Sequence, residues 1–299
     1  MKTIRDVVQS VRQKKTKKIA LAGISDEEIR IVTAATEEQL ATFILIDKED
    51  QLKAAQDIFS GHGSVSFECV EDTHDAAKKA VKLVREGKAA LPMKGQIHTS
   101  TFIKAVLDKE NGLSNGKRLS QITVFDGYND ELQFLTDCAI NIKPSMNELV
   151  DIIENAVAIY RVFGEPIPKV ALLAAVENVN EKMPDTLVAA AITQMNRRGQ
   201  IKGCIIDGPL SLDNAISEAF AAIKNIDSPV AGKAQILVSS MIQEANSLSK
   251  GIIHYAKRSA ASIIAGTSVP VIMTSRTDTA ENKLNTIAMS SFLEGAIYE

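Results

Sequence analysis

Short apolar runs alternate with longer amphipathic segments along almost the whole chain of 299 residues. Residues 18–23, 41–47 and 64–70 have the composition of strands, whereas residues 73–86 carry apolar side chains at helical spacing. Strands that alternate with helices in this way are typical of a mostly parallel sheet with crossover helices. The sequence therefore predicts an α/β fold.

One pair of strands interrupts the parallel pattern. Residues 121–126 and 134–142 are both strand-like, and residues 127–131 connect them. Because this connection is too short for a crossover helix, we expect an antiparallel pair. A capping box of Ser145 and Glu148 then begins a long helix, and a second series of strands and helices follows it.

Composition excludes several classes of protein. The net charge of −3 argues against a nucleic-acid partner, because nucleic-acid binders usually carry a basic excess. No apolar run approaches the roughly 20 residues of a membrane helix, so we expect no membrane association. Three separated cysteines, Cys69, Cys138 and Cys204, favour the reducing cytoplasm. The histidines lack neighbours at metal-ligand spacings, so we predict no metal site.

Polar residues follow the expected strands in four segments, residues 93–101, 207–215, 239–250 and 274–282. In open α/β sheets the ligand site lies beyond the carboxyl ends of the strands, so these segments are where chemistry is expected. Each one taken alone also fits a purely structural role as a tight turn or a helix cap.

The segment Thr274-Ser275-Arg276-Thr277-Asp278 is the most informative of the four. It places a guanidinium between an apolar strand and the start of a helix, where bidentate hydrogen bonds and free N–H groups favour an anion such as phosphate. The glycine-rich signatures of ATP and NAD sites are absent, and so is the G-x-S-x-G motif of hydrolases.

Together the four segments resemble the phosphate acetyltransferase and phosphate butyryltransferase family over nearly the whole chain, most closely its butyryl branch. The matching residues of the first half are Met93-Lys94-Gly95, His98-Thr99, Phe134-Leu135-Thr136-Asp137 and Asn141-Ile142. Those of the second half are Lys169 to Leu173, Lys182-Met183-Pro184, Asp207-Gly208-Pro209-Leu210, Leu212 to Ala215, Pro270-Val271, Ser275-Arg276, Asp278, Ala280-Glu281 and Lys283-Leu284-Asn285.

This resemblance implies a two-domain fold like that of isocitrate and isopropylmalate dehydrogenases, with mostly parallel sheets and an interdomain cleft. The expected domains are residues 1–143 plus 263–299 and residues 144–262. It also implies a homodimer that converts butyryl-CoA and inorganic phosphate to butyryl phosphate and CoA through a ternary complex. Coenzyme A is then a substrate, and no cofactor is expected.

The resemblance assigns catalytic roles to Ser275 and Arg276, with the arginine on the phosphate. The acetyl branch has a carboxylate base seven residues after the serine, where this chain has Asn282. Either Asp278 or Glu281 is therefore expected to act as the base. The residues expected to bind substrate are Lys94, Gly95, His98, Thr99, Asp207, Gly208, Pro209, Asp213, Asn246 and Lys250.

A second departure is Ala245, where the family pattern has a glycine before Asn246. An alanine restricts the backbone and narrows the space for a ligand, so the acyl preference can differ. Three alternatives stay open at this point: a phosphate acetyltransferase, a non-catalytic binder of CoA or acyl phosphate, and, less favoured, a metal-dependent 2-hydroxyacid dehydrogenase.

Overall fold

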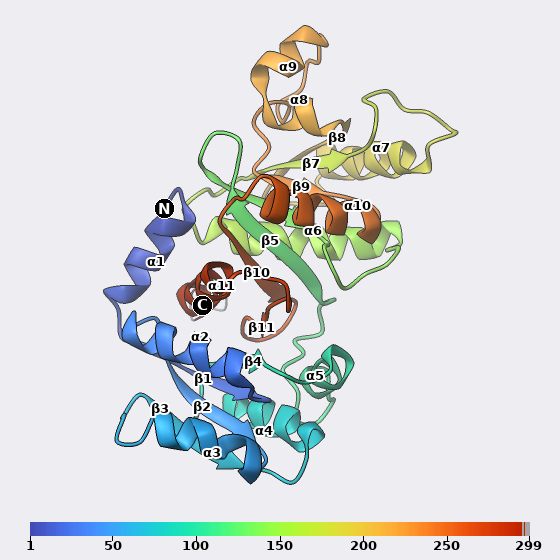
Figure 1. Ribbon diagram of the computed structural model, residues 1–299. Helices are drawn as coiled ribbons and strands as arrows, with labels where there is room; N and C mark the ends of the chain where they lie inside the picture. Colours follow the sequence, from blue (N-terminus) through green and yellow to red (C-terminus); the bar gives the residue numbers. More distant parts are fainter. Residues whose placement is uncertain (295, 297–299) are drawn as a thin grey trace. The chain divides into compact units, whose positions relative to one another are not determined.

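We describe the protein from a computed structural model, in which residues 1–294 and 296 are described. The chain forms two compact units (Figure 1). The terminal unit consists of Arg5–Lys117 and Ala261–Glu299, and the central unit consists of Met1–Ile4 and Arg118–Ala260. Both contain a sheet with mostly parallel strands and flanking helices, which confirms the predicted α/β class.

The sheet of the terminal unit is parallel throughout and has the strand order β11-β4-β1-β2-β3. Its strands are β1 (Lys17–Ala22), β2 (Ala41–Asp47), β3 (Val65–Cys69), β4 (Leu91–Lys94) and β11 (Ile272–Met273). Residues 19–22 of the middle strand are 0% exposed, because helices cover a parallel sheet on both faces. This burial explains the unbroken apolar run in that strand.

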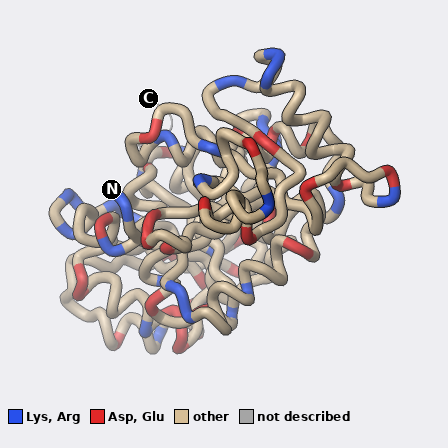
Figure 2. The backbone as a smooth tube through the Cα atoms, turned by 90° about the horizontal axis from the view of Figure 1, so that it is seen from above, with Lys and Arg blue, Asp and Glu red and all other residues tan. Residues whose placement is uncertain are grey.

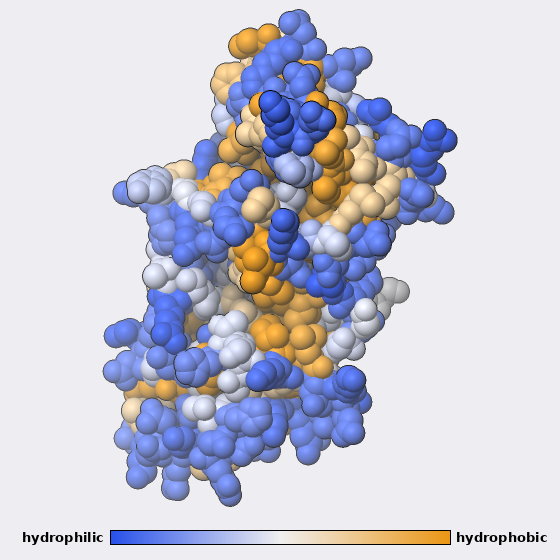
Figure 3. All heavy atoms as spheres, turned by 90° about the vertical axis from the view of Figure 1, so that its right-hand side faces the viewer, coloured by the Kyte–Doolittle hydropathy of each residue, from blue (hydrophilic) through white to orange (hydrophobic). Residues whose placement is uncertain are grey.

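The helices of this unit are α1 (Ile4–Arg12), α2 (Asp26–Glu37), α3 (Glu49–Ile58), α4 (Thr73–Arg85), α5 (Thr99–Val106) and α11 (Ala280–Leu293). Helix α2 packs against β2 and α11, whereas α4 packs against β1 and β4. Helix α4 buries three alanines and a Val-Leu-Val face, and its lysines lie on the outer side. Figure 3 shows hydrophilic side chains over the lower end of its view, where α3 and α4 lie in Figure 1.

Strands of the central unit are hydrogen-bonded in the order β5-β6-β9-β7-β8. They are β5 (Ser120–Asp126), β6 (Leu132–Thr136), β7 (Lys169–Leu173), β8 (Ile205–Leu210) and β9 (Ile236–Val238). Strands β5 and β6 pair antiparallel, as predicted, although β6 ends at Thr136 rather than at residue 142. The other pairs in this order are parallel.

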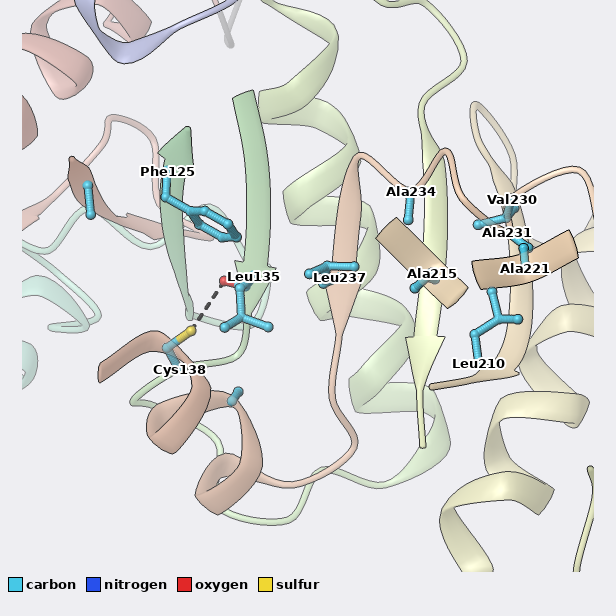
Figure 4. Close-up of a cluster of buried hydrophobic side chains, with 13 residues drawn as sticks. Phe125, Leu135, Cys138, Leu210, Ala215, Ala221, Val230, Ala231, Ala234 and Leu237 are labelled. Atoms are coloured by element: carbon cyan, nitrogen blue, oxygen red, sulfur yellow. Dashed lines mark hydrogen bonds between the residues drawn. The ribbon is translucent and has the colours of Figure 1, made fainter. Parts of the chain in front are cut away.

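The helices of the central unit are α6 (Met146–Arg161), α7 (Pro184–Arg197), α8 (Leu212–Ile216), α9 (Glu218–Ile223), α10 (Ile242–Lys250) and the π-helix η1 (Gly251–Tyr255). The predicted capping box of Ser145 and Glu148 is present at the start of α6. One hydrophobic cluster extends across the sheet from Phe125 through Leu135 and Leu237 to Leu210 (Figure 4). The residues after β6 are anchored to it, because the Cys138 thiol donates to the Leu135 carbonyl at 3.2 Å.

Residues 118–143 pack in the central unit rather than with the first domain to which they were assigned from sequence. The physical reason is strand pairing, since β6 pairs with β9 and thereby ties β5 and β6 to the second series of strands. The chain re-enters the terminal unit at Ala261, close to the expected residue 263. Strand β10 (Ala260–Ala265) starts at the last residue of the central unit and continues in the terminal unit.

Candidate active site

The carboxyl ends of three neighbouring strands define a candidate site in the terminal unit. Lys94 at the end of β4 is in register with Met273 at the end of β11 on one side and with Ala22 at the end of β1 on the other. Neighbouring strands are about 4.8 Å apart. The 95–98 loop and the 274–279 turn therefore leave the sheet side by side.

Gly95 makes the close approach between β4 and β1 possible. Its N–H donates to the Ala22 carbonyl at 2.9 Å. A side chain at this position would place its Cβ 2.0 Å from the Gly23 carbonyl oxygen. Only glycine fits without displacing backbone, so Gly95 fixes the path of the loop.

The turn that follows β11 is organised by hydrogen bonds between its own residues. The Ser275 N–H donates to the Asp278 carboxylate at 2.7 Å, and the Asp278 N–H donates to the Ser275 carbonyl at 3.2 Å. The Ser275 hydroxyl lies 3.0 Å from the Thr277 hydroxyl. Ser275 and Arg276 are exposed, whereas Asp278 is half-buried. The turn thus presents a hydroxyl, a guanidinium and a carboxylate within four residues.

Helix α11 starts directly after this turn, capped by Thr279, whose side chain accepts from the Asn282 N–H at 3.1 Å. Glu281 lies in the first turn of the helix, and its own side chain is exposed. Asn282 is 6% exposed and therefore buried. Of the two predicted base candidates, Asp278 accepts the Ser275 N–H.

Two acidic residues of α2 and a buried lysine complete this edge of the sheet. Lys283 on α11 has a side chain only 5% exposed and forms an ion pair with Glu27. The Ser25 hydroxyl at the start of α2 donates to Glu28. Sequence reasoning assigned no role in the site to Glu27, Glu28 or Lys283.

Positive charge gathers around Lys94. Burial lowers the pKa of this lysine, and the positive charges of Arg276 and Lys283 lower it further, while Glu28 acts in the opposite direction. Along the chain as a whole, basic and acidic residues are interspersed (Figure 2). At this edge the three cations lie among the carboxylates of Glu27, Glu28 and Asp278, and Arg276 is the cation that is exposed.

His98 and Thr99 are exposed at the start of α5. His98 occupies the N-cap position, but its side chain makes no capping hydrogen bond. The first N–H groups of any α-helix have no partner within the helix. The start of α5 therefore offers N–H donors next to the loop that begins at Gly95.

The remaining predicted residues belong to the central unit. Asp207 and Gly208 lie within β8, and Asp207 pairs with Arg197 at 3.5 Å. An added Cβ at Gly208 would meet the Cβ of Leu172 on β7 at 2.7 Å, so close strand packing requires glycine here. Pro209 follows through a cis peptide bond and is buried.

Asp213 takes part in a polar network that sequence reasoning did not find. Lys224 at the end of α9 donates to Glu177 at 2.6 Å, to the Ser211 hydroxyl at 3.0 Å and to Asp213 at 3.2 Å. The pKa of Glu177 is lowered to about 2, first by the hydrogen bond from Lys224 and then by that from Ser211. The pKa of Asp213 is also lowered to about 2, first by Ser211 and then by Lys224.

Asn246 and Lys250 lie on α10, which begins three residues before Ala245. The Asn246 amide donates to the Cys138 carbonyl at 2.9 Å, and Ala245 is fully buried. Lys250 is exposed at the junction between α10 and η1. Asn246 thus fixes the segment after β6, while Lys250 faces solvent.

The predicted residues therefore divide between the two units. The terminal unit brings together Lys94, Gly95, His98, Thr99, Ser275, Arg276, Asp278 and Glu281. The central unit holds Asp207, Gly208, Pro209, Asp213, Asn246 and Lys250. Within residues 1–294 and 296, no three His, Cys, Asp or Glu side chains are placed to hold a metal ion. No helix in this part of the chain is long and apolar enough to cross a membrane.

Comparison with known proteins gives consistent matches. A family model described as phosphate acetyl/butaryl transferase matches residues 59–291. The chain is 40% identical to the phosphate butyryltransferase of Clostridium acetobutylicum, over 99% of both chains. It is 39% identical to the phosphate acetyltransferase of Thermotoga maritima, over 93% of this chain and 95% of that protein. A branched-chain phosphotransacylase structure from Enterococcus faecalis aligns with a TM-score of 0.85 and 32% identity, covering 94% of this chain and 99% of that one.

Proposed function

Because the chain belongs to the phosphate acetyl/butaryl transferase family, we propose that it moves a butyryl group between coenzyme A and phosphate. The family match over 59–291 supports phosphate acyltransferase chemistry. The similar relatives carry both butyryl and acetyl names, so the acyl group is the finer part of the proposal. The proposed active site rests on the hydrogen bond that the Ser275 N–H donates to the Asp278 carboxylate.

In the direction of thioester formation, the sulfur of CoA attacks the carbonyl carbon of butyryl phosphate. A C–S bond forms, the C–O bond to phosphate breaks, and phosphate leaves with the bonding electron pair. The thiol proton passes to a base, because the thiolate is the stronger nucleophile. Negative charge develops on the carbonyl oxygen and on the leaving phosphate, so fixed donors must face both.

We assign the phosphate to Arg276, whose planar guanidinium can grip two phosphate oxygens at once. Its exposure at the end of β11 leaves the side chain accessible to a ligand. Ser275 donates its hydroxyl hydrogen bond to the thiol or to the developing oxyanion. Asp278 is the proposed base, because its carboxylate already lies against Ser275. Glu281 is the alternative, one turn further along.

Roles in forming the substrate sites are proposed for the other predicted residues of each unit. Lys94, Gly95, His98 and Thr99 shape the edge that carries Arg276 in the terminal unit. In the central unit, Gly208 and Pro209 set the path of β8, which also carries Asp207. Asp213 lies on α8, and Asn246 and Lys250 lie on α10. The proposed substrates are acyl-CoA, acyl phosphate and inorganic phosphate.

A butyryl chain has two methylene groups more than an acetyl chain. Burying them contributes about 1.6 kcal/mol, at about 0.8 kcal/mol each, which corresponds to roughly a fifteenfold preference.

Ala245 stands where the family pattern has glycine, and its complete burial means that it acts on helix packing. The proposed reaction needs neither metal nor prosthetic group. A cytoplasmic homodimer is the proposed state of the enzyme.

The test is a coupled assay with purified protein and CoA that follows thioester formation from butyryl phosphate and from acetyl phosphate. A higher kcat/KM for butyryl phosphate supports the proposal. A higher value for acetyl phosphate would assign the acetyl reaction instead. CoA binding by calorimetry with no turnover of either substrate would identify a non-catalytic binder.

A further inference from the structure

Lys94 is buried although it lies at the edge of the sheet. The residue is 8% exposed, and its ammonium group donates to the Gly95 carbonyl at 3.0 Å and to the Ile97 carbonyl at 3.4 Å. Both acceptors belong to the loop that Lys94 itself begins. The ammonium group of Lys94 therefore bonds backbone carbonyls of this loop.

The N–H groups of the same loop are also hydrogen-bonded. The Gly95 N–H donates to the Ala22 carbonyl, and the Gln96 N–H donates to the Gly23 carbonyl at 3.0 Å. The Ile97 N–H closes a tight turn onto the Gly95 carbonyl at 2.9 Å. The N–H groups of the loop are therefore bonded to β1 and within the turn, and two of its carbonyls are bonded to Lys94.

This tethered loop leads directly into α5. The His98 carbonyl accepts the Phe102 N–H at 3.1 Å, while the His98 side chain leaves the helix start uncapped. The direction of α5 and of its first N–H groups thus depends on the loop conformation. Phe102 is fully buried and anchors the other end of the turn.

Three charged groups act on Lys94, each from a different element. Arg276 follows β11, Glu28 lies on α2, and Lys283 lies on α11 with Glu27 as its partner. Arg276 is exposed, whereas Lys94 and Lys283 are buried. Of the three cations, Arg276 is thus the one presented to an incoming anion.

We infer that Lys94 is a positioning residue, which holds the Gly95–Ile97 backbone and the start of α5 beside Arg276 rather than binding phosphate itself. The inference rests on the proposed function for its kinetic consequences. It departs from the role expected from sequence, in which Lys94 contacts substrate directly. It also gives a reason for a buried lysine that bonds two backbone carbonyls although Arg276 lies nearby.

The surroundings of Lys94 also determine the direction in which its pKa is shifted. Burial and Arg276 lower its pKa, so its charge is lost at a lower pH than that of an ordinary lysine. Loss of this proton weakens the bonds to the Gly95 and Ile97 carbonyls, because charge-assisted hydrogen bonds are the stronger kind. We expect an alkaline decline in kcat that disappears when Lys94 is replaced.

The experiment compares wild type with Lys94→Met, Lys94→Gln and the control Lys104→Met, whose lysine is exposed on α5. Hydrogen exchange of peptides covering residues 95–106 is measured without substrate. Kinetics with butyryl phosphate and CoA give kcat and KM as functions of pH. Gln keeps a donor for the carbonyls but removes the charge, and it provides a second variant if Met does not fold.

We expect faster exchange in Lys94→Met and a kcat lower by about tenfold to a hundredfold, with KM for butyryl phosphate nearly unchanged. Lys94→Gln should recover part of the exchange protection and lose the alkaline decline. A raised KM with unchanged kcat and unchanged exchange would overturn the inference and make Lys94 a direct ligand. Unchanged exchange and kinetics would equally overturn it. If the wild type transfers no acyl group, the proposed function fails, and the exchange data still decide whether Lys94 holds the loop.

Discussion

The Asp278 carboxylate accepts a hydrogen bond from the backbone N–H of Ser275 at 2.7 Å. This contact places a carboxylate against the backbone of the exposed serine, although the sequence has Asn282 where the acetyl branch places its base. Asn282 is buried, and its backbone N–H donates to the Thr279 cap. Asp278, the proposed base, thus belongs to the same turn as Ser275.

Replacing Asp278 by Asn should lower kcat by about a hundredfold to ten-thousandfold, the usual contribution of a general base. Asn keeps an acceptor for the Ser275 N–H, so the turn should persist. Glu281→Gln is the matched control and should retain near-normal kcat. Steady-state kinetics of both variants identify which carboxylate is the base. A large loss of kcat in Glu281→Gln with near-normal kcat in Asp278→Asn would make Glu281 the base.

Gly95→Ala should destabilise the protein by about 2 kcal/mol and lower kcat about tenfold, because the added Cβ overpacks the backbone and shifts the loop. The clash is with the Gly23 carbonyl oxygen at 2.0 Å. Gly63→Ala serves as the control, since a Cβ there meets nothing within 4 Å. Urea denaturation and kinetics measure both effects. Equal stability of the two variants would contradict the close approach of β4 and β1.

Glu27→Gln should reduce the free energy of unfolding by about 1–3 kcal/mol, because it leaves the Lys283 ammonium buried without its partner. The estimate lies below that for a fully buried pair, since the Glu27 side chain is 43% exposed. The double variant Glu27→Gln with Lys283→Met should be more stable than Glu27→Gln alone. A double-mutant cycle in urea measures the coupling, and strictly additive effects would argue against the ion pair.

Lys224→Met should lower thermal stability at neutral pH and lose this effect in acid. The folded-state pKa values of Glu177 and Asp213 are about 2, below their ordinary values of 4.5 and 3.8. A lowered carboxylate pKa contributes stability above the unfolded value, and this contribution is lost as pH falls through the folded value. Melting curves from neutral pH to pH 2 should therefore converge for wild type and variant. The exposed Lys202→Met is the control, and a constant difference at every pH would contradict the network.

Much of the terminal sheet was predictable, because β1 and β2 carry the continuous apolar runs Ile19–Ala22 and Phe43–Ile46. The antiparallel pair β5 and β6 was also predictable, from the short connection between them. Helix α5 was missed, since only eight residues form it and His98 gives no capping signal. Strand β10 was missed because Ala260–Ala265 is a short run without clear punctuation before it.

The site was predictable where its residues follow one another in sequence, as in the turn from Ser275 to Asp278. Contacts across the fold were not. Glu177 lies 47 residues from Lys224, and the pairing of β7 with β8 helps bring it to Ser211. The role of Lys94 depends on carbonyl groups of the backbone, which carry no sequence signal.

The most direct measurement of the central claim is acyl transfer from butyryl phosphate to CoA by wild type, Ser275→Ala and Arg276→Ala, each checked for folding by circular dichroism. We predict turnover by the wild type and a loss of kcat by about a hundredfold to a thousandfold in each variant, as expected when a donor to developing negative charge is removed. Folded variants that keep the wild-type rate would show that the turn after β11 is not where phosphate and thiol react.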